Sequence, residues 1–184
     1  FGVLIACSGQ TPQELVAEGD RLKAEGNVRG AIVLYKNALE KDANDLSARI
    51  GLASAYRVSG SLDLAEQEFQ KVLLQNPSSH DILLQLAAIA IDRGEAQKGL
   101  AEIERFHSVI TPSAESLTLE GRAHGASGDL SRAENLFNKA IELNPSYPQA
   151  HLNLAKIYLQ RNEMSRAEQR LRETIVLDER LFEA

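Results

Sequence analysis

A 34-residue period constrains this chain more than any other feature of its sequence. The segment Gly128–Pro145 reads GDLSRAENLFNKAIELNP; related segments begin at Gly26 and Gly60, and weaker copies begin at Gly94 and Asn162. Four alanines keep this register at intervals of 34, 68 and 34 residues: Ala31, Ala65, Ala133 and Ala167. A fixed period of this length without slippage is typical of a helical repeat array.

Each period contains two amphipathic helical patterns separated by a turn. The best phase gives five repeats, at residues 12–45, 46–79, 80–113 (a degenerate copy), 114–147 and 148–181. Residues 1–7 are expected to be the tail of a signal peptide and residues 8–11 a linker. Residues 182–184 are expected to begin a further helix, which implies that the array continues or that a partner covers its apolar end.

Columns of equivalent residues support this division. The turn column holds residues that adopt a left-handed conformation at low cost: Gly26, Gly60, Gly94, Gly128 and Asn162. Small residues that allow close helix packing recur in the first helix (Gly19, Ala53, Ala87, Gly121, Ala155) and in the second (Ala31, Ala65, Gly99, Ala133, Ala167). A column of large residues is expected in the core: Tyr35, Phe69, Ile103, Phe137 and Leu171.

These residues resemble the tetratricopeptide repeat (TPR) family over 12–181, nearly the whole chain. The sequence departs from the family pattern where Leu15 and Leu117 replace a frequent Trp and where Glu18 and Glu120 occupy a usually apolar column. The resemblance implies an all-α fold, an α-solenoid of five tandem 34-residue helix-turn-helix repeats in a right-handed superhelix. It also implies a concave surface, lined mainly by the first helix of each repeat, that binds protein segments.

Mapped onto this sequence, the concave surface carries apolar residues flanked by polar ones. This row of apolar residues, one in each repeat, suits an extended or helical peptide whose apolar side chains anchor it and whose polar groups fix its position along the surface. The predicted peptide-binding groove consists of Val16, Asp20, Lys23, Ile50, Ser54, Arg57, Leu84, Gln85, Ile91, Thr118, Arg122, Leu152, Asn153, Lys156 and Leu159. Some of these residues could instead pack against a neighbouring helix. Because Val16, Ile50 and Leu84 stand where TPR co-chaperones carry basic residues, a clamp for chaperone tails is not expected.

Composition and motifs exclude several other functions. The net charge is −6, and no basic run suits nucleic acid or an anionic membrane surface. There is no HExxH, CxxC or phosphate-binding glycine loop, so we expect a non-enzymatic protein without cofactor or metal. His124 and His151 lie on neighbouring first helices, but no third zinc ligand accompanies them, and packing histidines are the favoured interpretation.

The N-terminus carries a separate signal. Residues 1–6 are apolar, and Leu4-Ile5-Ala6-Cys7 resembles the bacterial lipobox, in which the cysteine thiol receives a diacylglycerol. The resemblance implies lipidation at Cys7 and a lipid-anchored protein facing the periplasm of a bacterial cell envelope. The alternative is a buried cysteine in an ordinary terminal segment, and then a cytoplasmic protein.

A narrower resemblance follows from the order of these features. The lipobox, then PQELVAEGDRLKAEGN and AIVLYKNALEKDANDLSARIGLASAYRVSG, is similar to the start of TPR lipoproteins of exosortase (PEP-CTERM) exopolysaccharide systems. This implies an interaction scaffold for export or assembly. Two other interpretations stay open: a soluble cytoplasmic TPR adaptor, and the docking region of a larger enzyme whose catalytic domain lies beyond Ala184.

Overall fold

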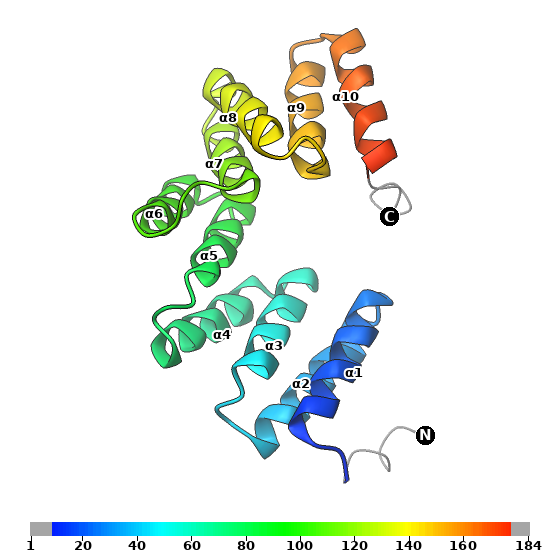
Figure 1. Ribbon diagram of the computed structural model, residues 1–184, viewed down its shortest axis with the longest axis vertical. Helices are drawn as coiled ribbons and strands as arrows, with labels where there is room; N and C mark the ends of the chain where they lie inside the picture. Colours follow the sequence, from blue (N-terminus) through cyan, green and yellow to red (C-terminus); the bar gives the residue numbers. More distant parts are fainter. Residues whose placement is uncertain (1–8, 178–184) are drawn as a thin grey trace. The chain divides into compact units, whose positions relative to one another are not determined.

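The computed structural model describes residues 9–177, and every regular element in this range is an α-helix (Figure 1). The helices are α1 (Pro12–Ala24), α2 (Val28–Lys41), α3 (Leu46–Val58), α4 (Leu62–Gln75), α5 (Asp81–Asp92), α6 (Ala96–His107), α7 (Ala114–Ala126), α8 (Leu130–Leu143), α9 (Pro148–Gln160) and α10 (Met164–Leu177). The all-α helical repeat fold is therefore confirmed. The hand of the superhelix stays a prediction, and the predictions for Cys7 and for residues 182–184 lie outside the described residues.

The turn inside each repeat adopts the conformation that its sequence column predicts. The φ angles are 79° at Gly26, 77° at Gly60, 80° at Gly94, 87° at Gly128 and 61° at Asn162. A side chain with a Cβ is disfavoured in this region, and Asn tolerates it better than most. The five positive φ angles therefore end the first helix of each pair at the same place in the period.

Polar side chains at the helix starts fix where several helices begin. The Thr11 hydroxyl accepts a hydrogen bond from the Glu14 amide (3.2 Å), and the Glu14 carboxylate accepts one from the Thr11 amide (2.7 Å). Asp45 and Asp129 cap α3 and α8 by accepting from the amides of Ala48 and Arg132. Such caps satisfy amides that the helix itself leaves unpaired.

The chain forms two compact units, residues 1–89 and 90–184, and the boundary falls inside α5. In the first unit α1 packs on α2 and α3 packs on α4, while α3 also contacts both helices of the preceding pair. The core of this unit centres on Tyr35 and Phe69, which are fully buried, together with Leu52 and Ile89.

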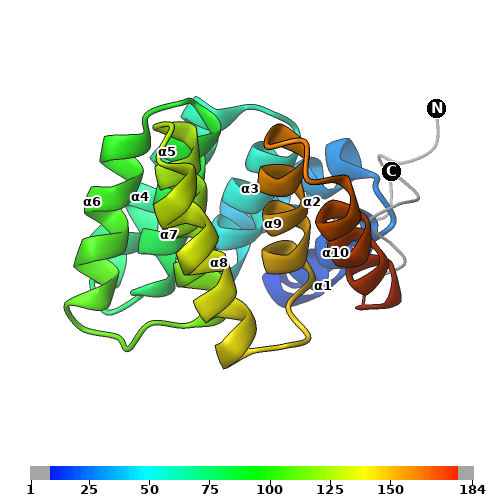
Figure 2. The same ribbon diagram turned by 90° about the horizontal axis from the view of Figure 1, so that it is seen from above.

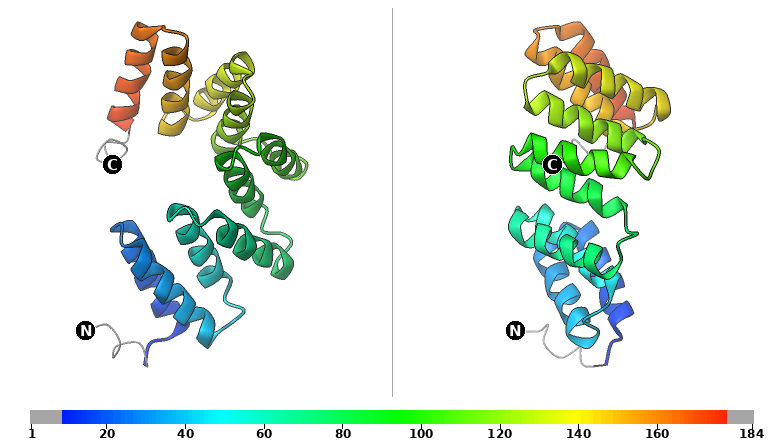
Figure 3. Two further views of the ribbon diagram at one scale, coloured as in Figure 1. Left: turned by 180° about the vertical axis from the view of Figure 1, so that it is seen from behind. Right: turned by 90° about the vertical axis from the view of Figure 1, so that its left-hand side faces the viewer.

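The second unit repeats this packing. Helix α7 pairs with α8 and α9 pairs with α10, and the neighbouring pairs meet through α8–α9 and α7–α9 contacts (Figures 2 and 3). Phe137 of α8 packs with Leu154, Ile157 and Tyr158 of α9. Within each unit the first helices of successive repeats thus touch one another, which places their outward faces next to each other.

Glycines opposite aromatic rings explain how these helices approach closely. A Cβ added at Gly121 would lie 2.5 Å from Cε1 of Phe137, and one at Gly19 would lie 2.8 Å from Cε1 of Tyr35. Both distances are too short for real carbon atoms. Gly19 and Gly121 therefore belong to the packing around the rings of Tyr35 and Phe137.

One member of the large column departs from the prediction of a core position. Leu171 is only half-buried, whereas Tyr35, Phe69, Ile103 and Phe137 are buried. In the described part of the chain no helix packs on α10 except α9, so the opposite side of Leu171 stays open. Its neighbour on the same face, Ile175, is 44% exposed.

None of the helices described between residues 9 and 177 combines the length and the apolar composition that crossing a membrane requires.

Candidate functional site

Several predicted groove residues converge on one hollow in the second unit. It has a volume of about 260 Å³ and lies over α7 and α9, with contributions from the end of α5 and from α8. Four predicted residues line it: Ile91, Arg122, Asn153 and Lys156. The other lining residues are Gly121, Gly125, Ala126, Leu130, Phe137, Ile157 and Gln160.

Glycines on α7 create the space in this hollow. Gly121 lies directly over the Phe137 ring, and a Cβ added at Gly125 would meet only the Ala133 methyl group, at 3.7 Å. The hollow is therefore floored by Phe137 and Ile157 without side chains from α7 filling it. Phe137 and Gly121 are buried members of the packing columns, and their place beneath a hollow could not be derived from periodicity. Gly125 has no repeat partner that would mark it.

Some polar side chains at the rim of the hollow already have hydrogen-bond partners, and one has no ion pair. Arg122 Nη2 donates to Asp92 Oδ1 at 2.6 Å, and Asn153 Nδ2 donates to the Gln149 carbonyl at 2.6 Å. Lys156 is exposed, and among the described residues no ion pair holds its ammonium group. A ligand in the hollow would therefore meet an apolar floor, one unengaged cation and one cation that is already paired.

A second hollow lies in the first unit, between α1 and the segment that leads into α3. Its volume is about 410 Å³. The predicted residues Val16 and Asp20 line it with Gln13, Ala17, Asp42, Asp45 and Ser47. Its rim is acidic, in contrast with the rim of the hollow in the second unit.

Some of the acidic groups of this second hollow already have partners. The Tyr35 hydroxyl donates to Asp20 Oδ1 at 2.6 Å, and the Lys23 ammonium lies 3.4 Å from the same oxygen. Burial, together with the neighbouring Asp20 carboxylate, raises the pKa of Tyr35 well above its ordinary value. Asp20 therefore anchors the core tyrosine, although its own side chain is 57% exposed.

The remaining predicted groove residues lie outside both hollows. Ile50 and Leu159 are exposed (37% and 45%), and five more are half-buried: Lys23, Ser54, Arg57, Gln85 and Leu152. They stay candidates for contact with a ligand. Two subsets of the predicted residues thus line hollows, one in each unit, and one groove across five repeats stays a prediction.

Two predicted groove residues are corrected by the structure. Leu84 and Thr118 are each only 3% exposed, so neither presents a surface to a ligand. The Thr118 hydroxyl donates back to the Ala114 carbonyl at 2.7 Å, which satisfies it inside its own helix. Leu84 lies on α5, whose side chains are buried on nearly every side, so its place in the apolar row did not predict its exposure.

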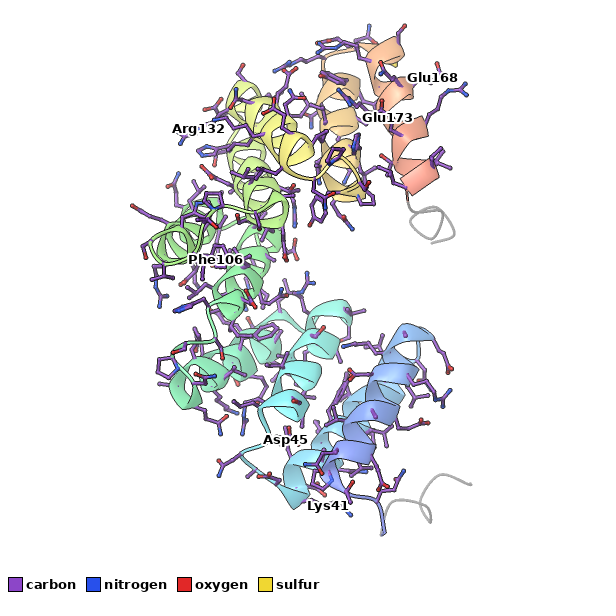
Figure 4. All side chains as sticks on the ribbon, viewed as in Figure 1. Lys41, Asp45, Phe106, Arg132, Glu168 and Glu173 are labelled. Carbon is purple, nitrogen blue, oxygen red and sulfur yellow. The ribbon has the colours of Figure 1, made fainter. Side chains whose placement is uncertain are left out.

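The two histidines considered as a zinc pair have different surroundings. His151 is buried, with Nδ1 2.9 Å from Glu173 and Nε2 2.9 Å from the Pro145 carbonyl. His124 instead faces Glu120, with Nε2 3.9 Å from Oε1. Figure 4 shows Glu173 on α10 beside α9, whereas Glu168 lies on the outer side of α10. Within residues 9–177 no three His, Cys, Asp or Glu side chains are placed to hold a metal ion.

The family comparison matches this geometry. A model of the tetratricopeptide repeat matches residues 22–80 and 126–176, which together exceed half of the chain.

Curated relatives are distant and much longer. The chain is 25% identical over 134 residues to tetratricopeptide repeat protein 8 of Caenorhabditis elegans, covering 72% of this chain and 26% of that protein. It is 24% identical over 161 residues to cellulose synthase operon protein C of Pseudomonas fluorescens, covering 83% and 13%. The chain thus spans about a quarter or less of the length of these relatives.

Solved structures share the fold. A thermophilic TPR protein of Thermus thermophilus superposes with a TM-score of 0.82 at 19% identity, over 92% of this chain and 93% of that one. YrrB, described as a TPR protein with an unusual peptide-binding site, superposes with a TM-score of 0.58 at 20% identity, over 90% and 86%. At these identities the likeness concerns the fold alone.

Proposed function

Because this chain belongs to the tetratricopeptide repeat family, a family of protein-interaction scaffolds, we propose that it binds a peptide segment of a partner protein across the outward faces of its first helices. The observation that carries the proposal is the hollow in the second unit, where Ile91, Arg122, Asn153 and Lys156 converge from three helices. An apolar floor with a few polar groups at its rim suits a side-chain anchor of an extended or helical peptide.

The charges at the rim define the segment that fits the hollow in the second unit. Lys156 is the unengaged cation, and Arg122 keeps donors beyond the one that binds Asp92. An apolar side chain would pack against Leu130, the half-buried apolar residue of the hollow, and a neighbouring acidic or amide group would pair with Lys156 and Asn153. The bound peptide therefore carries an apolar anchor next to an acidic or polar residue.

We further propose that the scaffold works at the bacterial cell envelope, anchored by a lipid on Cys7, in a system that exports or assembles polysaccharide. The support is the lipobox-like Leu4–Cys7 and the similarity to a relative named cellulose synthase operon protein C. Fatty-acid labelling in a bacterial host tests the anchor. Label should enter the wild-type protein and vanish in Cys7→Ser, whereas label in neither protein would refute the anchor.

Partner capture tests the groove. The double variant Asn153→Ala, Lys156→Glu should lose the partner that the wild-type chain retains, with unchanged far-UV circular dichroism. The matched control is Lys139→Glu. It makes the same change in charge as Lys156→Glu, at an exposed lysine on α8 that does not line the hollow. Equal capture by the double variant and the control would reject the groove as the binding surface.

A further inference from the structure

We propose that a third hollow, between α6, α7 and the start of α8, binds the cationic side chain of a lysine or arginine from a protein partner. This hollow has a volume of about 420 Å³. Its lining comprises Leu100, Ile103, Glu104 and His107 of α6, Glu120 and His124 of α7, and Arg132 of α8. The site is additional to the groove on which the proposed scaffold function rests.

Comparison with the other repeats shows how unusual this junction is. Glu120 occupies the position that holds Leu52, Leu86 and Leu154 in other repeats, and those leucines are 4%, 8% and 0% exposed. The equivalents of His107 are Leu39, Leu73, Ile141 and Ile175, and the equivalents of His124 include Tyr56 and Tyr158. Three positions that are apolar or aromatic in those repeats thus become titratable groups around one hollow.

Glu120 is poorly satisfied in this position. Its side chain is only 19% exposed, and the nearest side-chain nitrogens are Arg132 Nη2 at 3.8 Å and His124 Nε2 at 3.9 Å. Between residues 9 and 177 no hydrogen bond reaches its carboxylate. A carboxylate largely removed from water without hydrogen bonds destabilises the fold. A position that breaks the packing pattern without a compensating hydrogen bond is a candidate for function.

Glu18 provides a contrast in the same sequence column. On α1 it accepts hydrogen bonds from Arg21, with Oε1 2.6 Å from Nη2. The carboxylate in this column is therefore paired in the first repeat and left without a hydrogen bond in the fourth. The difference lies in the surroundings and not in the residue type.

The lining favours a cation with an alkyl stem. Glu104 and Glu120 present two carboxylates, and among the described residues Glu104 has no ion pair. The half-buried Leu100 supplies apolar surface for methylene groups, in the way that lysine and arginine stems pack elsewhere. Arg132 is 59% exposed, so its side chain is free to leave Glu120 when a better-placed cation enters (Figure 4). An anion would instead meet both carboxylates.

This hollow and the groove use different faces of α7. Glu120 and His124, one turn apart, line the third hollow, whereas Gly121, Arg122 and Gly125 line the hollow toward α9. A partner could therefore occupy one without displacing a ligand from the other. This separation allows the two sites to be tested independently.

The test follows the imidazole resonances of His107 and His124 by NMR while small probes are added to the whole chain. N-acetyl-arginine amide and N-acetyl-lysine amide should give saturable shifts. N-acetyl-norleucine amide, which keeps the stem without the charge, should bind about tenfold more weakly, the change expected for losing one charge-assisted hydrogen bond.

Variants assign the effect to the carboxylate. Glu120→Gln preserves the shape and should weaken binding of the arginine probe about tenfold. Glu18→Gln, the same change in the same column outside the hollow, should leave it unchanged. The proposal is overturned by shifts that do not saturate, by equal binding of the norleucine probe, by tighter binding of N-acetyl-glutamate amide, or by unchanged binding in Glu120→Gln. Each outcome is independent of partner capture in the groove.

Discussion

Two junctions between helix pairs in the second unit each contain a mostly buried carboxylate, and they treat it in opposite ways. Where α8 meets α9 and α10, Glu134 binds Arg161, accepts a hydrogen bond from the Tyr158 hydroxyl at 3.2 Å, and lies 3.4 Å from Arg166. Where α6 and α7 meet the start of α8, Glu120 is about equally buried, and its nearest cation is 3.8 Å away.

The difference separates a structural carboxylate from a candidate functional one. The charge of Glu134 is matched by donors from two helices, so it joins α8 to α9 and α10. Arg166 also stacks on the Tyr158 ring, with its Cζ 4.0 Å from the ring centroid, which extends the same network. Glu120 has only the longer contacts with Arg132 (3.8 Å) and His124 (3.9 Å) and accepts no hydrogen bond from the described residues, so its burial is a cost that the fold bears.

The largest effect is expected from the apolar cores, which should behave alike at the two junctions. Phe106 and Phe137 are each 3% exposed. Changing either to alanine should lower the free energy of unfolding by about 3–5 kcal/mol, because a large cavity is left. Urea denaturation measures this. A loss below about 1 kcal/mol for Phe106→Ala would show that α6 is not anchored by this side chain.

The next effect concerns Glu134. Glu134→Ala should lower the free energy of unfolding by about 2 kcal/mol, because Arg161, Arg166 and Tyr158 lose their common acceptor in a partly buried site. Lys139→Ala on the exposed face of the same helix is the control. If both variants unfolded at the same urea concentration, the network would make no net contribution.

The acid dependence of stability should also depend on Glu134. Burial acts to raise the pKa of Glu134, but hydrogen bonds from Arg161 and Tyr158 and the charge of Arg166 outweigh it and hold the pKa below its ordinary 4.5. The folded state therefore binds this proton less readily than the unfolded state. Its contribution is present above pH 4.5 and is lost as the pH falls through the lower folded value.

The matched variant for this pH effect is Glu134→Gln. The difference in free energy of unfolding between neutral pH and pH below 4.5 should be smaller in the variant than in the wild type. Urea titrations at both pH values measure it. An identical pH dependence in the two proteins would contradict the assignment to Glu134.

The smallest expected effect on stability is a gain and not a loss. Glu120→Leu restores the residue type that other repeats bury in this column, and it should raise the free energy of unfolding by roughly 1 kcal/mol. The same change at the paired Glu18 should not stabilise the chain. Loss of stability in Glu120→Leu would mean that the carboxylate supports the fold, and the contrast with Glu134 would disappear.

The period carried most of the information about the fold. The positive φ angles at Gly26, Gly60, Gly94, Gly128 and Asn162 follow from residue types, because few side chains tolerate that conformation. The packing of Tyr35 and Phe137 against facing glycines likewise follows from the sizes of the side chains. These properties depend on local conformation and on nearest neighbours, and both can be predicted from a repeating sequence.

The site was less predictable, because exposure depends on neighbours that the period does not specify. Ile50 and Leu84 are equivalent in sequence, yet the first is 37% exposed and the second 3%. The division of the chain inside α5 also has no signal in the repeat pattern. The sequence showed Glu120 as a departure from the family pattern. Only the distances to Arg132 and His124 showed that its carboxylate lacks a close partner.

Site-specific photocrosslinking tests the central claim that this scaffold holds its partner on the faces of its first helices. A photoreactive phenylalanine analogue at Lys156, at the rim of the hollow over α7 and α9, is compared with the same residue at Leu74, which is 83% exposed on α4. We expect a crosslinked partner from position 156 and none from position 74. Crosslinking from position 74 alone would contradict it.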